Sequence, residues 1–125
     1  MKRSAKLILV KGGRVLMVQR AKDGLWTFPG GKQKRFEKPK ECLLREAAEE
    51  LPQVRLQKVR RWKKLQRRTP KGKTRQVVYR ARYTGGALDV GDTAELVRAE
   101  WRYLNGTRLA PTAQRVTRKL FGCAE

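Results

Sequence analysis

One helical segment in the middle of the chain, residues 39–51, is the feature that most restricts the possible fold. Pro39 opens this segment, good helix formers follow, and Pro52 ends it. Apolar, strand-like runs precede it at 5–10, 14–20 and 25–29 and follow it at 54–65, 75–84 and 96–104. A second helix is expected over 112–121. Strands on both sides of one central helix, closed by a second helix, predict an α+β fold with a mixed sheet between helices.

Local patterns indicate how these segments are connected. Lys11-Gly12-Gly13 separates the first two runs, which predicts a β-hairpin, and Gly30-Gly31 with the basic stretch after it predicts a loop. In the last helix, Thr112 is the expected N-cap, and Val116 and Leu120 share an apolar face. Alternation along 75–84 predicts one strand face made of Val77, Tyr79, Ala81 and Tyr83 and an opposite face made of Val78, Arg80 and Arg82.

The composition limits both the number of domains and the chemistry. The 125 residues are expected to form a single domain, 1–125, with 32 Lys and Arg, 11 Asp and Glu, and a formal charge of +21. This charge implies attraction for polyanions such as nucleic acid, polyphosphates and nucleotides. The absence of histidine removes Ser-His and Cys-His nucleophile systems and imidazole metal sites.

No apolar run approaches the ~20 residues that span a membrane, and the apolar stretch after the basic N-terminus is too short for an export signal. The two cysteines, Cys42 and Cys123, lie far apart in the sequence and form no metal-type pair. Two free thiols indicate a reducing compartment, so we expect a cytoplasmic protein without membrane contact.

The scarce acids are clustered on the central helix. Five of the eleven lie within fourteen residues: Glu37, Glu41, Glu46, Glu49 and Glu50. On a helical wheel, the last three share one face, which we expect to be exposed, while an opposite buried stripe contains Leu44, Ala47, Ala48 and Leu51. Carboxylates so close together repel one another unless a cation such as Mg²⁺ lies among them. The alternative is that they form only the solvated face of an amphipathic helix.

The spacing of these residues resembles the Nudix box of the Nudix (MutT-like) hydrolases, G-x5-E-x7-R-E-U-x-E-E-x-G-U with U apolar, over about residues 31–53. The matching positions are Gly31, Glu37, Arg45, Glu46, Glu49 and Glu50. The preceding WTFPGGK is also similar to the strand and loop that enter this box. The resemblance implies an α/β/α sandwich with a mixed central sheet, covering the whole chain as one Nudix hydrolase domain.

The resemblance also implies an activity and a set of residue roles. A Nudix enzyme hydrolyses a pyrophosphate bond with Mg²⁺ or Mn²⁺ as cofactor. Glu46, Glu49 and Glu50 would bind metal or activate water, together with a backbone carbonyl of Gly30 or Gly31. Arg45 would orient the glutamates, Glu37 would be a supporting acid, and Glu95, more than Glu100, would be the further acid from a later loop.

Two positions depart from the family pattern. Pro52-Gln53 stands where the box has glycine and an apolar residue, although proline also ends a helix. Phe36 stands where the family often has glycine before the first glutamate. Both changes affect backbone conformation more than they affect the proposed metal ligands.

A basic segment follows the box. Positions 55–82 contain thirteen Lys or Arg and no acid. This segment would attract an anionic substrate or contact RNA, with Trp62 available to stack on a base. The alternative is a sheet whose outward face is basic and whose Trp62 lies in the core. Lys32, Arg20 and Trp62 are the candidate substrate-binding residues.

Three functions are compatible with these features. The first is cation-dependent hydrolysis of the pyrophosphate bond in a nucleoside diphosphate-X or a similar highly phosphorylated small molecule. The second is removal of pyrophosphate from RNA 5′ ends. The third is a basic nucleic-acid-binding module on a Nudix fold, which would gain nothing from clustered acids. Salt dependence separates them, because binding through many phosphates weakens steeply with added salt.

Overall fold

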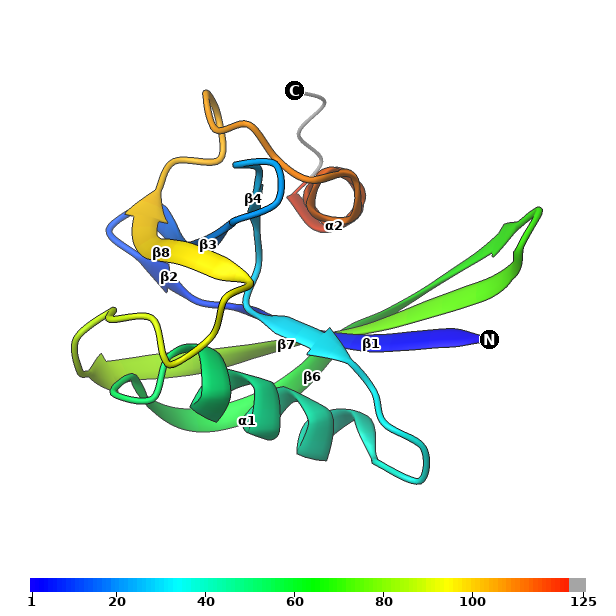
Figure 1. The fold of residues 1–125 in the computed structure, drawn as a ribbon, viewed down its shortest axis with the longest axis horizontal. Helices are drawn as coiled ribbons and strands as arrows, with labels where there is room; N and C mark the ends of the chain where they lie inside the picture. Colours follow the sequence, from blue (N-terminus) through cyan, green and yellow to red (C-terminus); the bar gives the residue numbers. More distant parts are fainter. Residues whose placement is uncertain (122–125) are drawn as a thin grey trace.

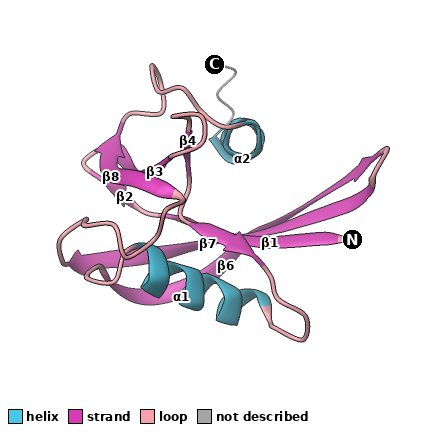
Figure 2. Cartoon of the chain, viewed as in Figure 1, coloured by secondary structure: helices cyan, strands magenta, loops and turns pink. Residues whose placement is uncertain are grey.

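A computed structural model describes residues 1–121 of the chain. It contains eight strands and two helices within these residues (Figures 1 and 2). In chain order they are β1 (Lys2–Ile8), β2 (Val10–Lys11), β3 (Arg14–Arg20), β4 (Trp26–Thr27), β5 (Gly30–Lys32), α1 (Pro39–Glu50), β6 (Arg55–Thr69), β7 (Gly72–Gly85), β8 (Leu96–Arg102) and α2 (Pro111–Phe121).

The strands form two sheets that lie between the two helices (Figure 1). The first sheet has the order β5-β1-β7-β6 and is mixed, because β1 runs antiparallel to β5 but parallel to β7. The second sheet is antiparallel, with β3 pairing β2, β4 and β8. The predicted α+β fold with a mixed sheet between helices is therefore confirmed.

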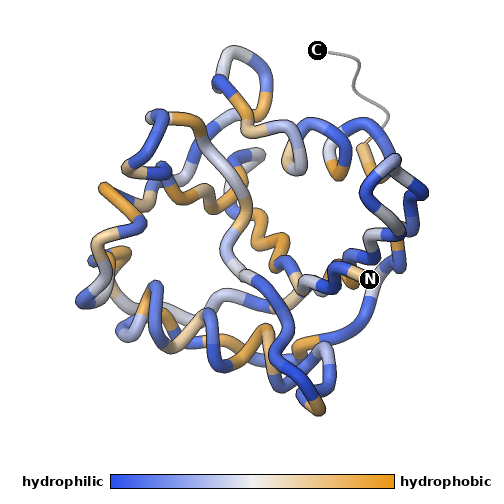
Figure 3. Tube along the Cα trace, turned by 45° about the vertical axis from the view of Figure 1, so that its right-hand side comes forward, coloured by the Kyte–Doolittle hydropathy of each residue, from blue (hydrophilic) through white to orange (hydrophobic). Residues whose placement is uncertain are grey.

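Each helix covers its own hydrophobic cluster. The α1 cluster includes Leu7, Leu43 and Val77, and the α2 cluster includes Ile8, Val78 and Val116. Neighbouring residues of one strand thus belong to opposite clusters, as alternation along a strand requires. The predicted faces of 75–84 are confirmed by the same division, and apolar residues concentrate on the strands between the helices (Figure 3).

The predicted hairpin of 5–10 with 14–20 is wrong for most of the first run. Only Val10 and Lys11 pair with β3, whereas residues 2–8 form β1 and lie between β5 and β7. Because β1 is buried on both faces from Ala5 onward, apart from Lys6, its apolar run carries no alternation that would identify its partners. The predicted loop at Gly30-Gly31 is also wrong, since Gly30–Lys32 is strand β5 and Gly31 pairs with Ala5.

The two strands predicted at 54–65 and 75–84 are longer than expected. They form one hairpin, β6–β7, that turns between Thr69 and Gly72 and extends beyond the rest of the fold (Figure 1). The residues expected as a loop between these strands are therefore mostly strand. These residues are mostly polar or basic, so they show no alternation of apolar side chains from which the extension of the strands could be predicted.

Both helices begin close to their expected starts. α1 begins at Pro39, as predicted, and α2 begins at Pro111, so Thr112 lies inside the first turn and is not the N-cap. Val116 is buried and Leu120 packs against the α2 cluster. No helix within residues 1–121 is long and apolar enough to cross a membrane.

The buried face of α1 differs from the predicted stripe. Cys42, Leu43 and Glu50 are buried, whereas Leu44 is 45% exposed and Ala48 is exposed. The helix is therefore rotated so that Glu46 and Glu50 face β5 and do not point to solvent. A Gly-Gly strand leaves room for these carboxylates, and a backbone N–H of Gly30 gives one of them a partner. Cys42 is a buried free thiol, and Cys123 lies outside the described residues.

Candidate active site

Glu50 is the most buried of the acids on α1. It ends the helix, is 9% exposed, and its Oε1 accepts a hydrogen bond from the Gly30 backbone N–H at 2.9 Å. Burial raises the pKa of Glu50 to about 7, and the negative charges of Glu46 and Glu95 act in the same direction. The Gly30 hydrogen bond and the positive charge of Lys6 oppose this shift. A carboxylate with a pKa close to neutral is suited to proton transfer.

Glu46 lies directly against the second glycine of β5. A Cβ placed on Gly31 would be 2.5 Å from the carboxyl carbon of Glu46, so no larger residue fits there without moving the carboxylate. Glu46 accepts a hydrogen bond from Arg45 Nη1 at 2.9 Å, and its side chain is 18% exposed. Glu49 is 57% exposed and lies 3.5 Å from the same guanidinium nitrogen. Arg45 thus sits between the two carboxylates and partly neutralises their repulsion.

Arg45 also forms hydrogen bonds that link α1 to the preceding loop. Its Nε and Nη2 donate to the two carboxylate oxygens of Glu37 at 2.7 and 3.0 Å, and Nη2 also donates to the Lys32 carbonyl at 3.2 Å. Glu37 further accepts from the Lys34 backbone N–H at 2.8 Å. The Arg45 hydrogen bonds and the Lys34 N–H hold the pKa of Glu37 at about 2, so this acid stays ionised. A bidentate pair of this kind fixes orientation as well as charge.

The donor set suits a hard divalent cation, because carboxylate oxygens are the ligands that Mg²⁺ and Mn²⁺ prefer. The acids are not assembled around a common point, since within residues 1–121 no three histidine, cysteine or acidic side chains are arranged to hold a metal. Glu46 and Glu49 share Arg45 as their partner, whereas Glu50 is bonded to Gly30. The Gly31 carbonyl accepts a weak bond from the Cys42 thiol at 3.5 Å. The residues that could hold a cation are Glu46, Glu49 and Glu50, and the carboxylate of Glu46 occupies the space over Gly31.

Lys6 is a residue of this region that the sequence reasoning missed. It lies on β1, pairs with Gly30, and its Nζ donates to the Phe28 carbonyl at 3.3 Å. Burial lowers the pKa of Lys6, while the nearby charges of Glu50 and Glu46 raise it. The sequence signal for Lys6 is its place in the otherwise apolar run 5–10. Burying a charge there costs free energy unless the charge has a partner or a function.

The remaining predicted residues lie in different surroundings. Glu95 is exposed, precedes β8, and its charge reaches Glu50, whereas Glu100 is paired with Arg102 at 2.8 Å. Arg20 is paired with Asp23, and its Nε lies 3.1 Å from Oδ1. Trp62 packs edge-on against Phe121 at 5.8 Å and beneath Arg80, in the α2 cluster. The core alternative therefore describes Trp62 better than base stacking does.

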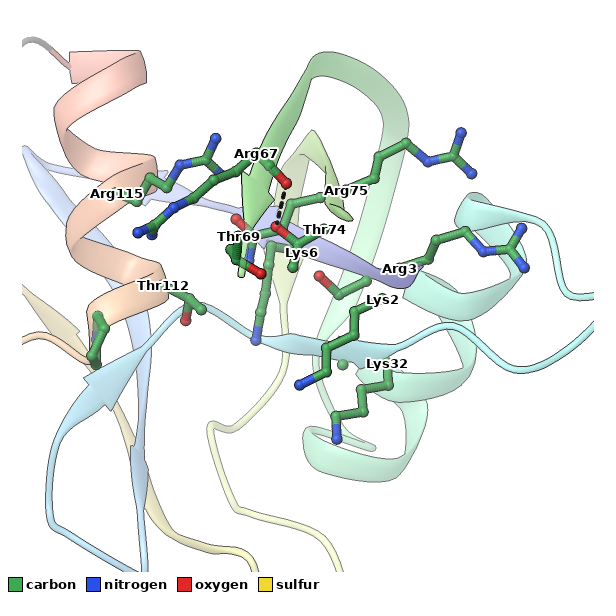
Figure 4. A pocket seen from close by; sticks show the side chains of 14 residues that line it. Lys2, Arg3, Lys6, Lys32, Arg67, Thr69, Thr74, Arg75, Thr112 and Arg115 are labelled. Atoms are coloured by element: carbon green, nitrogen blue, oxygen red, sulfur yellow. Dashed lines mark hydrogen bonds between the residues drawn. The ribbon is translucent and has the colours of Figure 1, made fainter. Parts of the chain in front are cut away.

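A cavity of about 320 Å³ lies between β1, β5, the β6–β7 hairpin and α2 (Figure 4). Gly31 and Lys32 of β5 form part of its lining, and Lys6 is also in it. Arg20, Trp62 and Glu95 are outside this lining. Of the three candidate substrate-binding residues, only Lys32 therefore lines this cavity.

Comparison with known proteins identifies a family and several solved structures that are similar to this chain. Residues 1–120 match the sequence model of the NUDIX domain family. A MutT NUDIX hydrolase from Burkholderia pseudomallei is similar in structure with a TM-score of 0.78 and 20% identity, over 95% of this chain and 97% of that one. The NUDIX domain of Shewanella oneidensis NrtR, solved in complex with ADP ribose, has a TM-score of 0.70 and 22% identity over 97% and 85%.

A third similar structure is an ADP-ribose pyrophosphatase from Streptococcus suis, with a TM-score of 0.69 and 21% identity over 98% of this chain and 89% of that one. At these identities the structural likeness concerns the fold. No match was found among functionally curated protein sequences.

Proposed function

This chain belongs to the NUDIX family of hydrolases, which act on pyrophosphates, and from that premise we propose that it is a divalent-cation-dependent pyrophosphohydrolase. Its substrate would be a nucleoside diphosphate-X or a similar highly phosphorylated small molecule. The observation that carries the proposal is the placement of Glu46 and Glu50 on the face of α1 turned toward Gly30 and Gly31. An ordinary solvated acidic helix face would point these side chains outward.

Each residue of the site has a task in this proposal. Glu46, Glu49 and Glu50 would hold Mg²⁺ or Mn²⁺, which when bound would neutralise phosphate charge and acidify a water. Arg45 keeps Glu46 and Glu49 together and, through Glu37, fixes the loop over them. Gly31 keeps the space beside Glu46 free of a side chain.

The chemistry is a hydrolysis that needs no histidine. The water oxygen bonds to phosphorus, the P–O bond of the bridge breaks, and two phosphorylated products leave. The proton released by the water passes to a glutamate of the cluster. Glu95 would contribute a further negative charge from the loop before β8, on the side of Glu50.

Lys32 would contact the phosphates, because it belongs to both β5 and the adjoining cavity. Arg20 would act at longer range, since its guanidinium is paired with Asp23. ADP ribose, named with two of the similar structures, belongs among the compounds to be tested. The buried free thiol of Cys42 agrees with the expected cytoplasmic location.

The test is a hydrolysis screen with Mg²⁺ and Mn²⁺ over nucleoside diphosphate derivatives, dinucleoside polyphosphates and diphosphoinositol polyphosphates. Glu46→Gln should reduce turnover of any confirmed substrate by at least about a hundredfold, because electrostatic and ligand roles of this kind are large. Glu41→Gln is the matched control, since Glu41 caps the same helix and glutamine preserves that capping bond. Equal activity of Glu46→Gln and Glu41→Gln would show that the site is misassigned.

A second candidate function is removal of pyrophosphate from RNA 5′ ends. It is favoured by the β6–β7 hairpin, which is basic along its length and extends beyond the fold (Figure 1). Turnover of 5′-triphosphate RNA should then fall steeply with added salt, whereas turnover of a small substrate should fall less. RNA binding with no Glu46-dependent turnover of any compound would instead indicate a nucleic-acid-binding module.

A further inference from the structure

The cavity beside the acidic site is enclosed by three parts of the fold. β1 and β5 form one wall, the end of the β6–β7 hairpin forms another, and the first turns of α2 form the third (Figure 4). Its volume of about 320 Å³ is at the lower end of the range for small-molecule sites. Gly31, which lies against the carboxylate of Glu46, is also part of the lining, so the cavity is next to the acidic site.

The cavity is lined by cations that come from opposite sides. Lys2, Lys6 and Lys32 line it from β1 and β5, and Arg67 and Arg115 line it from the hairpin and α2 (Figure 4). Hydroxyl groups from the same elements also line the cavity, on Ser4, Thr69, Thr74 and Thr112. Among the described lining residues there is no acid and no aromatic side chain.

These cations form no ion pair within the described part of the protein, although the charges of Glu50 and Glu46 act on Lys6. The ion pairs found within residues 1–121 involve Arg20, Arg45, Arg98 and Arg102, and none of these five lysines and arginines. Arg115 donates instead to the neutral Gln66 carbonyl at 2.8 Å, which holds its guanidinium near Arg67. Burial first, and then the like charges of Arg67 and Arg118, lower the pKa of Arg115. Positive groups gathered in this way favour an anion that lies among them.

The types of residue in the lining indicate which part of a substrate the cavity can bind. Proteins commonly stack a base on an aromatic side chain, and the described lining residues include none. Lysines, arginines and hydroxyls instead match phosphate oxygens. A nucleoside would leave several of the cations without a partner, whereas a phosphate at each wall would satisfy them.

We propose that the substrate of this site is a compact small molecule that carries several phosphates besides the diphosphate that is cleaved. Those further phosphates bind between Lys2, Lys6 and Lys32 on one wall and Arg67 and Arg115 on the other. The inference rests on the proposed hydrolase function, since it assigns the substrate class of the same site. It distinguishes this chain from an enzyme that selects a nucleoside diphosphate by its base.

The binding test uses two probes that contain no diphosphate bond, inositol hexakisphosphate and AMP, titrated calorimetrically into the full chain at about 150 mM salt. Inositol hexakisphosphate should bind at least about a hundredfold more tightly, because two or more additional charge-assisted bonds each contribute about tenfold or more. Arg67→Gln and Lys32→Gln should each weaken its binding by about tenfold. AMP binding as tight as that of inositol hexakisphosphate would overturn the proposal.

Arg68→Gln is the matched control, because this substitution removes the same charge. Arg68 follows Arg67 on the same strand and faces away from the cavity. The substitution should change the affinity less than twofold. An equal loss in all three variants would mean that only the net charge attracts the probe, and the cavity assignment would fail.

Hydrolysis separates this inference from the function on which it rests. A diphosphoinositol polyphosphate should be turned over with a higher kcat/KM than ADP ribose, and Glu46→Gln should abolish both reactions. If ADP ribose were the better substrate in a Glu46-dependent reaction, the substrate class would be wrong and the hydrolase function would stand. If the probe bound as expected but no diphosphate were hydrolysed, the function would be wrong and the binding site would stand.

Discussion

Arg45 joins α1 to the loop before it, because its guanidinium donates two hydrogen bonds to the carboxylate of Glu37, eight residues earlier in the chain. The same guanidinium reaches Glu46 at 2.9 Å and Glu49 at 3.5 Å. One side chain therefore sets the distance between the loop and the acidic face of the helix. The Nudix spacing between Glu37 and Arg45 is explained by this contact.

Replacing Arg45 with lysine should reduce activity more than it reduces stability. A lysine keeps the charge but cannot bond both oxygens of Glu37 while contacting Glu46. We expect kcat to fall by about 10–100-fold, as when residues that orient metal ligands are changed. Kinetics with a confirmed substrate and thermal unfolding of the same preparations check this. Because Arg45 acts by positioning, the Mg²⁺ concentration needed for half-maximal activity should also rise, and an unchanged value would argue against that role.

The two glycines of β5 should respond differently to alanine. In Gly31→Ala the new Cβ meets only the mobile end of the Glu46 side chain, so the fold should persist while the carboxylate is displaced and activity drops. In Gly30→Ala the Cβ overlaps the backbone carbonyl of Ala5, and φ is +134°, so the protein itself should be destabilised by at least about 2 kcal/mol. Chemical denaturation and activity measured on both variants test the contrast. Similar unfolding free energies for the two would contradict it.

The sequence predicts the fold class, the α1 boundaries and the grouping of the acids, because prolines, alternation and motif spacing are local signals. It does not predict which way α1 turns. A wheel drawn from hydropathy buries Leu44 and exposes Glu50, while the fold does the reverse. The deciding interactions, Glu50 with Gly30 and Glu46 against Gly31, join residues up to twenty positions apart and concern polar groups that hydropathy treats as outward.

The cavity could not be predicted for a similar reason. Lys6, Lys32, Arg67 and Arg115 come from four separate elements. They come together because β1 pairs with β5 and β7, β7 pairs with β6, and α2 lies beside these strands. In a chain with 32 basic residues, composition alone cannot distinguish these from cations on the outer surface. The role of the basic segment in anion attraction stays a prediction, whereas Trp62 within it packs against Phe121.

Phe36 provides a test of backbone strain in the loop before Glu37. Its φ is +68°, and its ring is 91% exposed, so little hydrophobic burial compensates for the conformation. Asparagine tolerates this region, whereas a β-branched residue does not. Phe36→Asn should therefore be about 1–2 kcal/mol more stable than Phe36→Val, as measured by chemical denaturation. Both variants lose the contact of the ring with Arg35, so this contact cancels in the comparison. Equal stability of the two would mean that the loop relaxes to a negative φ.

Glu50 should make the stability of the metal-free protein depend on pH. Its pKa is about 7 in the folded chain against 4.5 for an ordinary glutamate, so the folded state binds its proton more tightly than the unfolded state does. The contribution is fully present below pH 4.5 and is lost as the pH rises through 7. The unfolding free energy in EDTA should thus fall by about 3 kcal/mol between pH 4.5 and 8.

Glu50→Gln isolates this contribution. Glutamine does not titrate, so the difference in unfolding free energy between wild type and variant should change with pH in the stated direction. The chain has no histidine to titrate in this range. Glu37, with its pKa at about 2, loses its stabilising effect only as the pH falls below 4.5. Lys6, whose pKa is lowered by burial, acts in the opposite direction, since its contribution is lost as the pH falls. A pH-independent difference would show that Glu50 is solvated in the folded protein and does not sit against Gly30.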